Sequence, residues 1–169
     1  MKRYGPALAC ACLVLVAGCG AGGDAQQDSA AEQVAALEAG GDIPALDRTA
    51  GLLGPDADGN GVRDDIDRYL AGLALEPTQA SAAEQFARAL QSTLAADPAD
   101  EAAVRQAALG LSRAGQCLAF RHVPNRSGLI TALEGFTADT RERSARYMGF
   151  NRALSGSVSR LLSGDTCDG

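Results

Sequence analysis

From residue 62 onward, apolar residues recur every three or four positions, the spacing of a helix that packs on one face. The pattern predicts helices at about 64–75, 81–96, 98–120, 127–136 and 139–154, with the apolar stripe of the last continuing through Val158 towards Leu162. Asp97 and Pro98 are expected to begin the third of these as N-cap and first helical residue. No alternating β-branched run follows residue 43. The expected fold class is therefore all-α, a small bundle of four to five helices.

Two segments of different composition precede the predicted bundle. Residues 43–55 contain apolar residues without a regular period, interrupted by Gly51, Gly54 and Pro55, which indicates an extended lead-in packed on the domain. Residues 20–42 are mostly Gly, Ala, Gln and Asp, and they bury too little apolar surface to offset the entropy of ordering. We expect a flexible, disordered tether there, with a transient helix at 33–39.

The strongest local motif is the Asp-rich segment 56–67. Its oxygen-bearing residues stand at positions 1, 3, 5, 7, 9 and 12 of a calcium loop, with Gly61 at the sharp turn of position 6. The predicted Ca²⁺ ligands are Asp56, Asp58, Asn60, the carbonyl of Val62, Asp64 and Asp67. The alternative is an Asp-rich turn that only caps the next helix, but capping needs just one or two acidic groups.

Gly54 and Pro55 make a long helix entering this loop implausible. The loop therefore resembles the reduced calcium loops of dockerins and thrombospondin type 3 repeats, which also end in Asp. The resemblance implies a structural Ca²⁺ ion, bound as weakly as in extracellular modules, at roughly 10⁻⁴–10⁻³ M. Dockerins carry two copies and this chain carries one, so their binding function is not implied.

The first residues read as an export signal. Lys2 and Arg3 precede an apolar stretch at 7–17 that is too short to be a stable membrane span. Residues 16–19, Val-Ala-Gly-Cys, resemble the lipobox of bacterial lipoproteins, which implies cleavage before Cys19 and its modification with diacylglycerol and an acyl chain such as palmitate. The alternative is an ordinary signal peptide. The expected organisation is a signal at 1–18, a tether at 19–42 and a calcium-loop and helical domain at 43–169.

The residue after Cys19 is Gly20 and not Asp. By resemblance to enteric lipoproteins, this residue implies sorting to the outer membrane, facing the periplasm, with exposure at the cell surface as the alternative. The membrane would be contacted through lipidated Cys19, since two or three acyl chains give stable anchoring.

Cysteine usage agrees with export. Cys10 and Cys12 fall in the predicted leader, and Cys19 would carry lipid. Cys117 and Cys167 remain as an even pair in an oxidising compartment, so we expect a disulfide between them. Two buried free thiols are the alternative.

Composition limits the function classes. The net charge of −6 becomes −8 when Lys2 and Arg3 leave with the leader, and every remaining cation is then Arg. An acidic chain without clustered Lys or Arg is not expected to bind nucleic acid. Hydrophobic residues make up 46% of the chain but aromatic residues only 4%, so we expect a thin core of closely packed, Ala-rich helices.

No catalytic constellation is apparent. The chain has one histidine, His122, and lacks a nucleophile elbow. The run Arg141, Arg143, Arg146 and Arg152 is interpreted as a solvated helix face paired with acidic neighbours, or alternatively as an anion site.

Residues 46–48, 54–56 and 60–67, with Tyr69, Tyr147, Asn151, Leu154 and Gly156, together resemble an uncharacterised group of proteobacterial exported proteins. That resemblance implies no activity. The sequence favours a calcium-stabilised, non-enzymatic cell-envelope lipoprotein that is a structural or interaction module, with an envelope protein as partner. The alternative is a ligand-binding or hydrolase-like lipoprotein with an Arg-lined cleft between helices.

Overall fold

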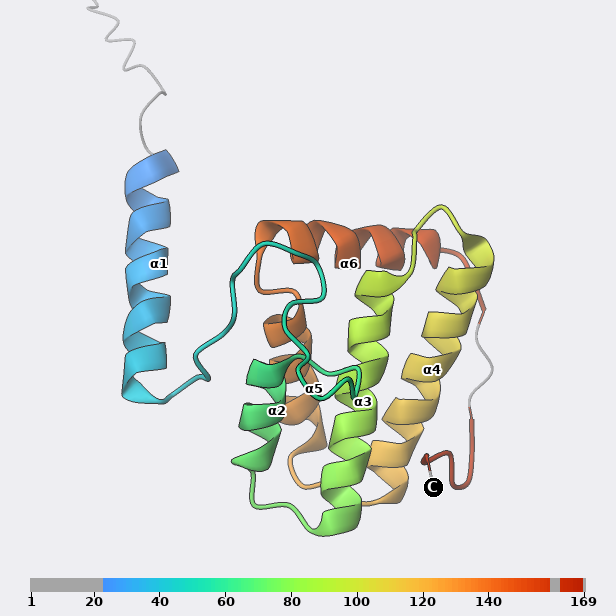
Figure 1. Ribbon diagram of the computed structural model, residues 1–169. Coiled ribbons are helices and arrows are strands. Elements are labelled where there is room, and N and C mark those ends of the chain that lie inside the picture. The colour runs from blue at the N-terminus through green and yellow to red at the C-terminus, as the bar shows by residue number, and fades with distance from the viewer. Residues whose placement is uncertain (1–22, 159–161, 169) are drawn as a thin grey trace, which may run out of the picture. The chain divides into compact units, whose positions relative to one another are not determined.

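The computed structural model describes residues 23–158 and 162–168, and these contain helices and no strand (Figure 1). The helices are α1 (Gly23–Gly40), α2 (Asp64–Ala71), α3 (Pro77–Ala95), α4 (Glu101–Phe120), α5 (Arg126–Thr137) and α6 (Arg141–Ala153). Contacts between residues group the chain into two units, with the boundary after Ala36. The second unit begins at Leu37 and contains α2–α6. The predicted all-α bundle is confirmed. The predicted signal sequence and Cys19 lie outside the described residues.

Helix α1 lies in the predicted tether and ends at Gly40, where the sequence pattern ended its short helix. It begins at Gly23, well before residue 33. Between Glu32 and Gly40 only Val34 and Glu38 are partly buried. A helix of small and polar residues without an apolar face has little tertiary packing to stabilise it. The assignment of 19–42 as a tether therefore stays a prediction.

The antiparallel pair α3 and α4 forms the centre of the bundle, and α6 lies across their ends (Figure 1). Helices α2, α5 and α6 all contact α3. The buried hydrophobic residues with no exposed surface are Ala83, Leu90, Leu94, Ala114, Cys117, Leu118 and Leu133. Alanines at these positions allow the helix axes to approach closely, as the Ala-rich composition predicted.

Two helix starts differ from the sequence-based prediction because the capping residues lie elsewhere. Helix α3 begins at Pro77, where the side chains of Glu76 and Gln79 form a capping box. Helix α4 begins after Asp100, whose carboxylate accepts hydrogen bonds from the N–H groups of the first turn. Asp97 and Pro98 instead form the preceding turn, closed by the Asp100 N–H bonding the Asp97 carbonyl at 2.9 Å.

Two helix ends are also earlier than predicted. Helix α2 stops at Ala71, before Gly72, and α6 stops at Ala153. Beyond α6, Gly156 takes a φ of +81°, which a continuing helix cannot accommodate. Val158 is 98% exposed, so its predicted place on an apolar helical stripe is wrong.

Candidate metal-binding loop

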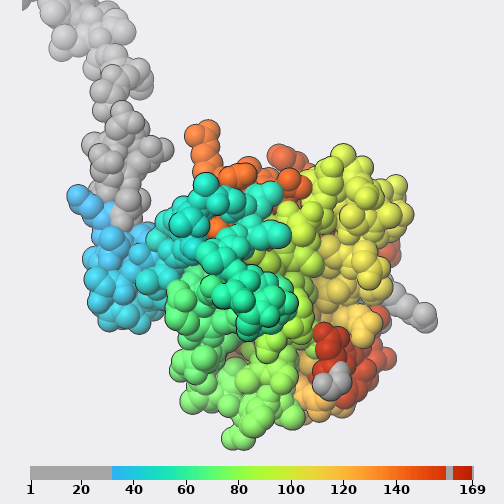
Figure 2. All heavy atoms as spheres, in the orientation of Figure 1, coloured from blue at the N-terminus to red at the C-terminus, as the bar shows by residue number. Residues whose placement is uncertain are grey.

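The lead-in, residues 43–55, has no helix and carries the chain across the surface to the Asp-rich loop at 56–67 (Figures 1 and 2). Its backbone polar groups are held by side chains of the bundle. The N–H of Asp47 donates to Asp65 Oδ2 at 2.7 Å, and Gln91 of α3 donates to the Leu53 carbonyl. The extended lead-in predicted from the sequence is confirmed.

Side chains at positions 1, 3 and 5 of the loop bond its backbone. The Asp56 carboxylate accepts from the N–H groups of Asn60 at 3.1 Å and Gly61 at 3.0 Å. Asp58 Oδ1 also accepts from the Asn60 N–H at 3.1 Å. Gly59 and Gly61 have φ values of +71° and +83°, which allow the tight reversal. The first half of the loop is thus folded around its own carboxylates.

Asn60 also connects the two ends of the loop. Its Nδ2 donates to Asp58 Oδ2 at 3.3 Å and to Asp67 Oδ2 at 3.0 Å, which brings position 12 to position 3. Asp64 has a different role, since its Oδ1 accepts from the Ala57 N–H at 2.8 Å. Of the predicted ligand side chains, Asp58, Asn60 and Asp67 are therefore linked directly to one another. The Asp56 and Asp64 carboxylates bond backbone N–H groups of the loop.

The electrostatics of the loop favour a positive occupant. Burial raises the pKa of Asp67; the hydrogen bond from Asn60 opposes that rise, and the charges of Asp58, Glu84 and Asp56 add to it. A bound cation would relieve this concentration of negative charge.

The fit to a cation depends on the Asn60 side chain. Among residues 23–158 and 162–168, no group of three His, Cys, Asp or Glu side chains is already arranged to hold an ion. Asn60 Nδ2 lies between the Asp58 and Asp67 carboxylates instead. Rotation of that amide would present its oxygen, as Ca²⁺ requires, but it would also break the bond that Asn60 Oδ1 accepts from the Val62 N–H at 2.7 Å. The residue types are those that Ca²⁺ takes, although Asn60 acts here as a donor between the two carboxylates.

A buried cluster of two arginines and two aspartates, which the sequence did not reveal, anchors the loop to the bundle. Arg63 has no exposed surface and binds Asp65 through two bonds, Nε to Oδ1 at 2.6 Å and Nη2 to Oδ2 at 2.8 Å. It also reaches Asp139 at 3.3 Å and the Phe136 carbonyl at 3.0 Å. Burial alone would raise the pKa of Asp65, but the hydrogen bonds from Arg63 and from backbone N–H groups hold it below its usual value.

Arg143 of α6 completes this cluster, so its predicted place on a solvated helix face is wrong. It is fully buried and pairs with Asp139 at 2.9 Å. Its other donors bond three lead-in carbonyls, those of Asp47, Gly51 and Leu52. One guanidinium therefore fixes a stretch of lead-in that has no secondary structure of its own. The i,i+4 spacing of Asp139 and Arg143 was the available sequence signal.

Gly54 passes against both arginines and offers a direct test of this packing. Its φ is +70°, and an added Cβ would lie 2.4 Å from Arg63 Cδ and 2.9 Å from Arg143 Nη2. We expect Gly54→Ala to destabilise the protein by about 2–4 kcal/mol, from backbone strain and overpacking together. Gly110→Ala in α4 is the control, because nothing lies within 4 Å of its Cβ position. Urea denaturation should show this control unchanged or more stable by up to about 1 kcal/mol; equal loss in both variants would contradict the packing.

Cys117 and Cys167 form the disulfide expected from the sequence, with a Cα–Cα distance of 4.9 Å. Cys117 lies fully buried in α4, and Cys167 packs against the same core. The bond fixes the C-terminal segment, residues 162–168, to the bundle.

The basic residues considered for an Arg-lined cleft do not come together. Arg146 of α6 donates to the Ala96 carbonyl at 3.1 Å, next to the start of α4. His122 follows the other end of α4, a helix of 20 residues and so about 30 Å long. Arg152 shares α6 with Arg146. A catalytic or anion site using all three has no geometric support.

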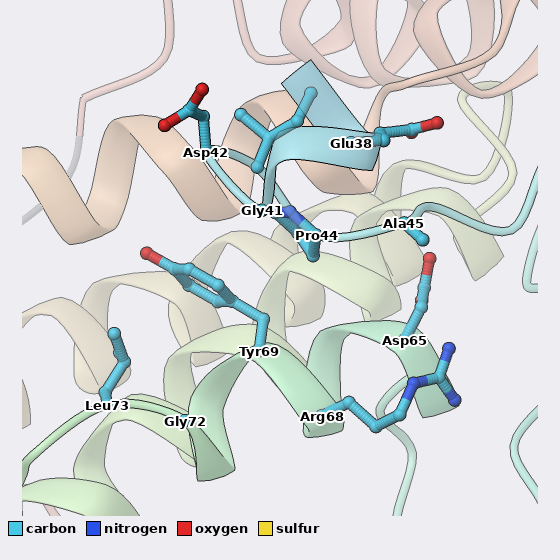
Figure 3. Close-up of a pocket in the computed structure, with 11 residues that line it drawn as sticks. Glu38, Gly41, Asp42, Pro44, Ala45, Asp65, Arg68, Tyr69, Gly72 and Leu73 are labelled. Atoms are coloured by element: carbon cyan, nitrogen blue, oxygen red, sulfur yellow. The ribbon is translucent and has the colours of Figure 1, made fainter. Parts of the chain in front are cut away.

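A hollow of about 420 Å³ lies between α2 and the start of the lead-in (Figure 3). Its acidic groups are largely engaged, because Glu38 pairs with Arg48 at 2.6 Å and Asp65 pairs with Arg63. Arg68 and Tyr69 line its other wall. This arrangement contains no nucleophile and base pair.

Within the described ranges, no helix has the length and apolar character to cross a membrane. Comparisons with protein-family models, with curated proteins and with solved structures gave no match to this chain.

Proposed function

We propose that this chain is a calcium-stabilised lipoprotein domain of the cell envelope and acts as a non-enzymatic structural or interaction module. Under this proposal the ion holds the extended lead-in and the first bundle helix together. The partner expected for the module is another envelope protein.

The observation that carries the proposal is the link between the ends of the loop through Asn60. Asp58 and Asp67, nine residues apart, both bond its amide group, and Asp56 bonds the backbone beside it. A turn that served only to cap α2 would not need the Asp56 and Asp58 carboxylates to bond Asn60 and Gly61 within the loop. Neither aspartate lies in α2 or caps it through a side-chain bond. The spacing and this convergence together support a Ca²⁺ site.

Calcium binding is tested by NMR titration of the uniformly ¹⁵N-labelled protein, a method suited to millimolar affinities. Added Ca²⁺ should shift the amide signals of Asn60, Gly61 and Val62 with a dissociation constant of about 10⁻⁴–10⁻³ M. Asp58→Ala should weaken binding at least tenfold. Asp42→Ala removes the same charge from an exposed position outside the loop and should bind as the wild type does.

Two outcomes would contradict the site. In the first, the wild-type loop amides do not move at 10 mM Ca²⁺, about ten times the weakest expected dissociation constant. In the second, Asp58→Ala and Asp42→Ala lose affinity equally, which would mean that only the overall charge attracts the ion.

The membrane anchor of the proposal rests on the lipobox-like residues ending at Cys19. Mass spectrometry of the membrane-extracted protein should find an N-terminal Cys19 carrying diacylglycerol and an acyl chain. Cys19→Ser should release the protein from the membrane fraction. An unmodified Cys19, or a membrane-bound Cys19→Ser variant, would contradict anchoring through this residue.

A further inference from the structure

The C-terminal segment, residues 162–168, is seated on the outer face of α3 and α4 by more than its disulfide. Gln85 of α3 bonds it twice, donating to the Thr166 carbonyl at 3.2 Å and accepting from the Asp168 N–H at 3.1 Å. Thr166 Oγ1 donates to the Arg113 carbonyl of α4 at 2.7 Å. The disulfide thus holds a segment whose backbone and side chains are specifically paired.

Arg88 stands between this C-terminal segment and the Asp-rich loop. One turn of α3 beyond Gln85, its Nη1 donates to the Asn60 carbonyl at 3.2 Å, and its Nη2 lies 3.6 Å from the Asp168 carboxylate. Its side chain also covers the turn, since a Cβ added to Gly61 would lie 3.2 Å from Arg88 Cγ. Glu84 binds the same guanidinium at 3.1 Å. A single side chain therefore contacts the disulfide-held segment and the loop.

We propose that Arg88 makes the order of the loop dependent on the Cys117–Cys167 disulfide. While the disulfide is closed, Asp168 is held beside Arg88 and helps to fix the guanidinium on the Asn60 carbonyl. When it opens, the segment loses its covalent attachment, Asp168 leaves, and Arg88 regains freedom to move off the loop. The structure then contains a thiol-sensitive link between two parts of the chain that are distant in sequence.

The opening step is thiol–disulfide exchange with a dithiol reductant. One thiolate of the dithiol attacks a sulfur of the pair, and the mixed disulfide then resolves by attack of the second thiolate. Cys117 and Cys167 gain two electrons and two protons as thiols, and the dithiol is oxidised to its own disulfide. Cys167 is the more exposed sulfur-bearing residue of the two.

Amide hydrogen exchange, measured in EGTA so that no calcium is involved, tests this link. Asp168→Asn keeps the disulfide and removes only the charge that faces Arg88. It should speed exchange at Asn60, Gly61 and Val62 about two- to fivefold, the range expected from one exposed ion pair. Dithiol treatment of the wild type should speed it at least as much. Asp165→Asn is the matched control, because Asp165 pairs with Arg121 and not with Arg88.

A second variant isolates the role of Arg88. In Arg88→Gln the loop should exchange quickly in both redox states, with no further response to Asp168→Asn. Unchanged loop exchange in Asp168→Asn, or an equal change in Asp165→Asn, would overturn the proposal.

A consequence for calcium affinity rests additionally on the proposed function. Asp168→Asn should bind Ca²⁺ about two- to fivefold more weakly, because the loop that supplies the ligands is then less ordered. By reciprocity, bound Ca²⁺ should reduce the increase in loop amide exchange that dithiol causes. If the wild type binds no Ca²⁺, the proposed function fails while the exchange experiment still decides the link. If the wild type and Asp168→Asn bind Ca²⁺ equally and their loop amides exchange at the same rate, the link fails and the proposed function stands.

Discussion

Replacing Arg143 with methionine is expected to lower the free energy of unfolding by about 3–5 kcal/mol, because it removes one partner from a buried ion pair. Methionine fills much of the volume but leaves Asp139 with a single, longer contact to Arg63 at 3.3 Å. Asp139 Oδ2 is already buried without a hydrogen-bond partner among the described residues. The carbonyls of Gly51 and Leu52 lose their donors as well. The measurement is urea denaturation followed by circular dichroism.

Arg141→Met is the matched control for this experiment, since Arg141 is exposed at the start of the same helix. A substitution there should change stability by less than about 0.5 kcal/mol. If both variants lower the free energy of unfolding equally, the effect comes from removing a positive charge from α6 and not from the buried cluster. The cluster would then have no special part in holding the lead-in.

Removing the disulfide with the double substitution Cys117→Ala and Cys167→Ala should cost about 4 kcal/mol. Closing a loop of 50 residues lowers the entropy of the unfolded chain by that amount in the loop-closure model. The same loss should appear when the wild type is reduced, because both treatments free the unfolded chain. The comparison is made by urea denaturation with and without dithiol.

The double variant supplies its own control, since dithiol should not change its stability further. A wild type that loses less than about 1 kcal/mol on full reduction would contradict the role assigned to the disulfide. So would a dithiol effect that persists in the double variant.

Helical periodicity predicted which elements form, because apolar residues that recur at helical spacing can be buried only together. Phe86, Leu90, Leu118 and Leu133 lie in the core where the pattern placed them. The helix starts were less well predicted. Several polar residues near each start could act as caps, and tertiary packing decides which one does: Asp100 caps α4, although Asp97 satisfies the same local rule.

The Asp-rich loop and the buried charges differ in how far sequence could predict them. The loop residues lie within twelve positions of one another, so their spacing alone predicts Asp56, Asp58 and Asp67 as ligands. The cluster joins Arg63 to Asp139, 76 residues later, and a single sequence carries no signal for such a pairing. The sequence predicts a solvated position for Arg143 because the chain is acidic and arginine is its only cation after the predicted leader. Its partners include lead-in carbonyls, which no side-chain pattern reveals.

The proposed stabilisation of this fold by calcium is tested most directly by one pair of thermal melts. The oxidised wild-type protein is melted in 5 mM CaCl₂ and in excess EGTA at the same ionic strength. With a dissociation constant of about 0.1–1 mM, mass action predicts a gain of about 1–2.3 kcal/mol in calcium. For a domain of this size that gain should raise the melting temperature by a few degrees. Melting temperatures that agree within error in the two buffers would contradict stabilisation by calcium.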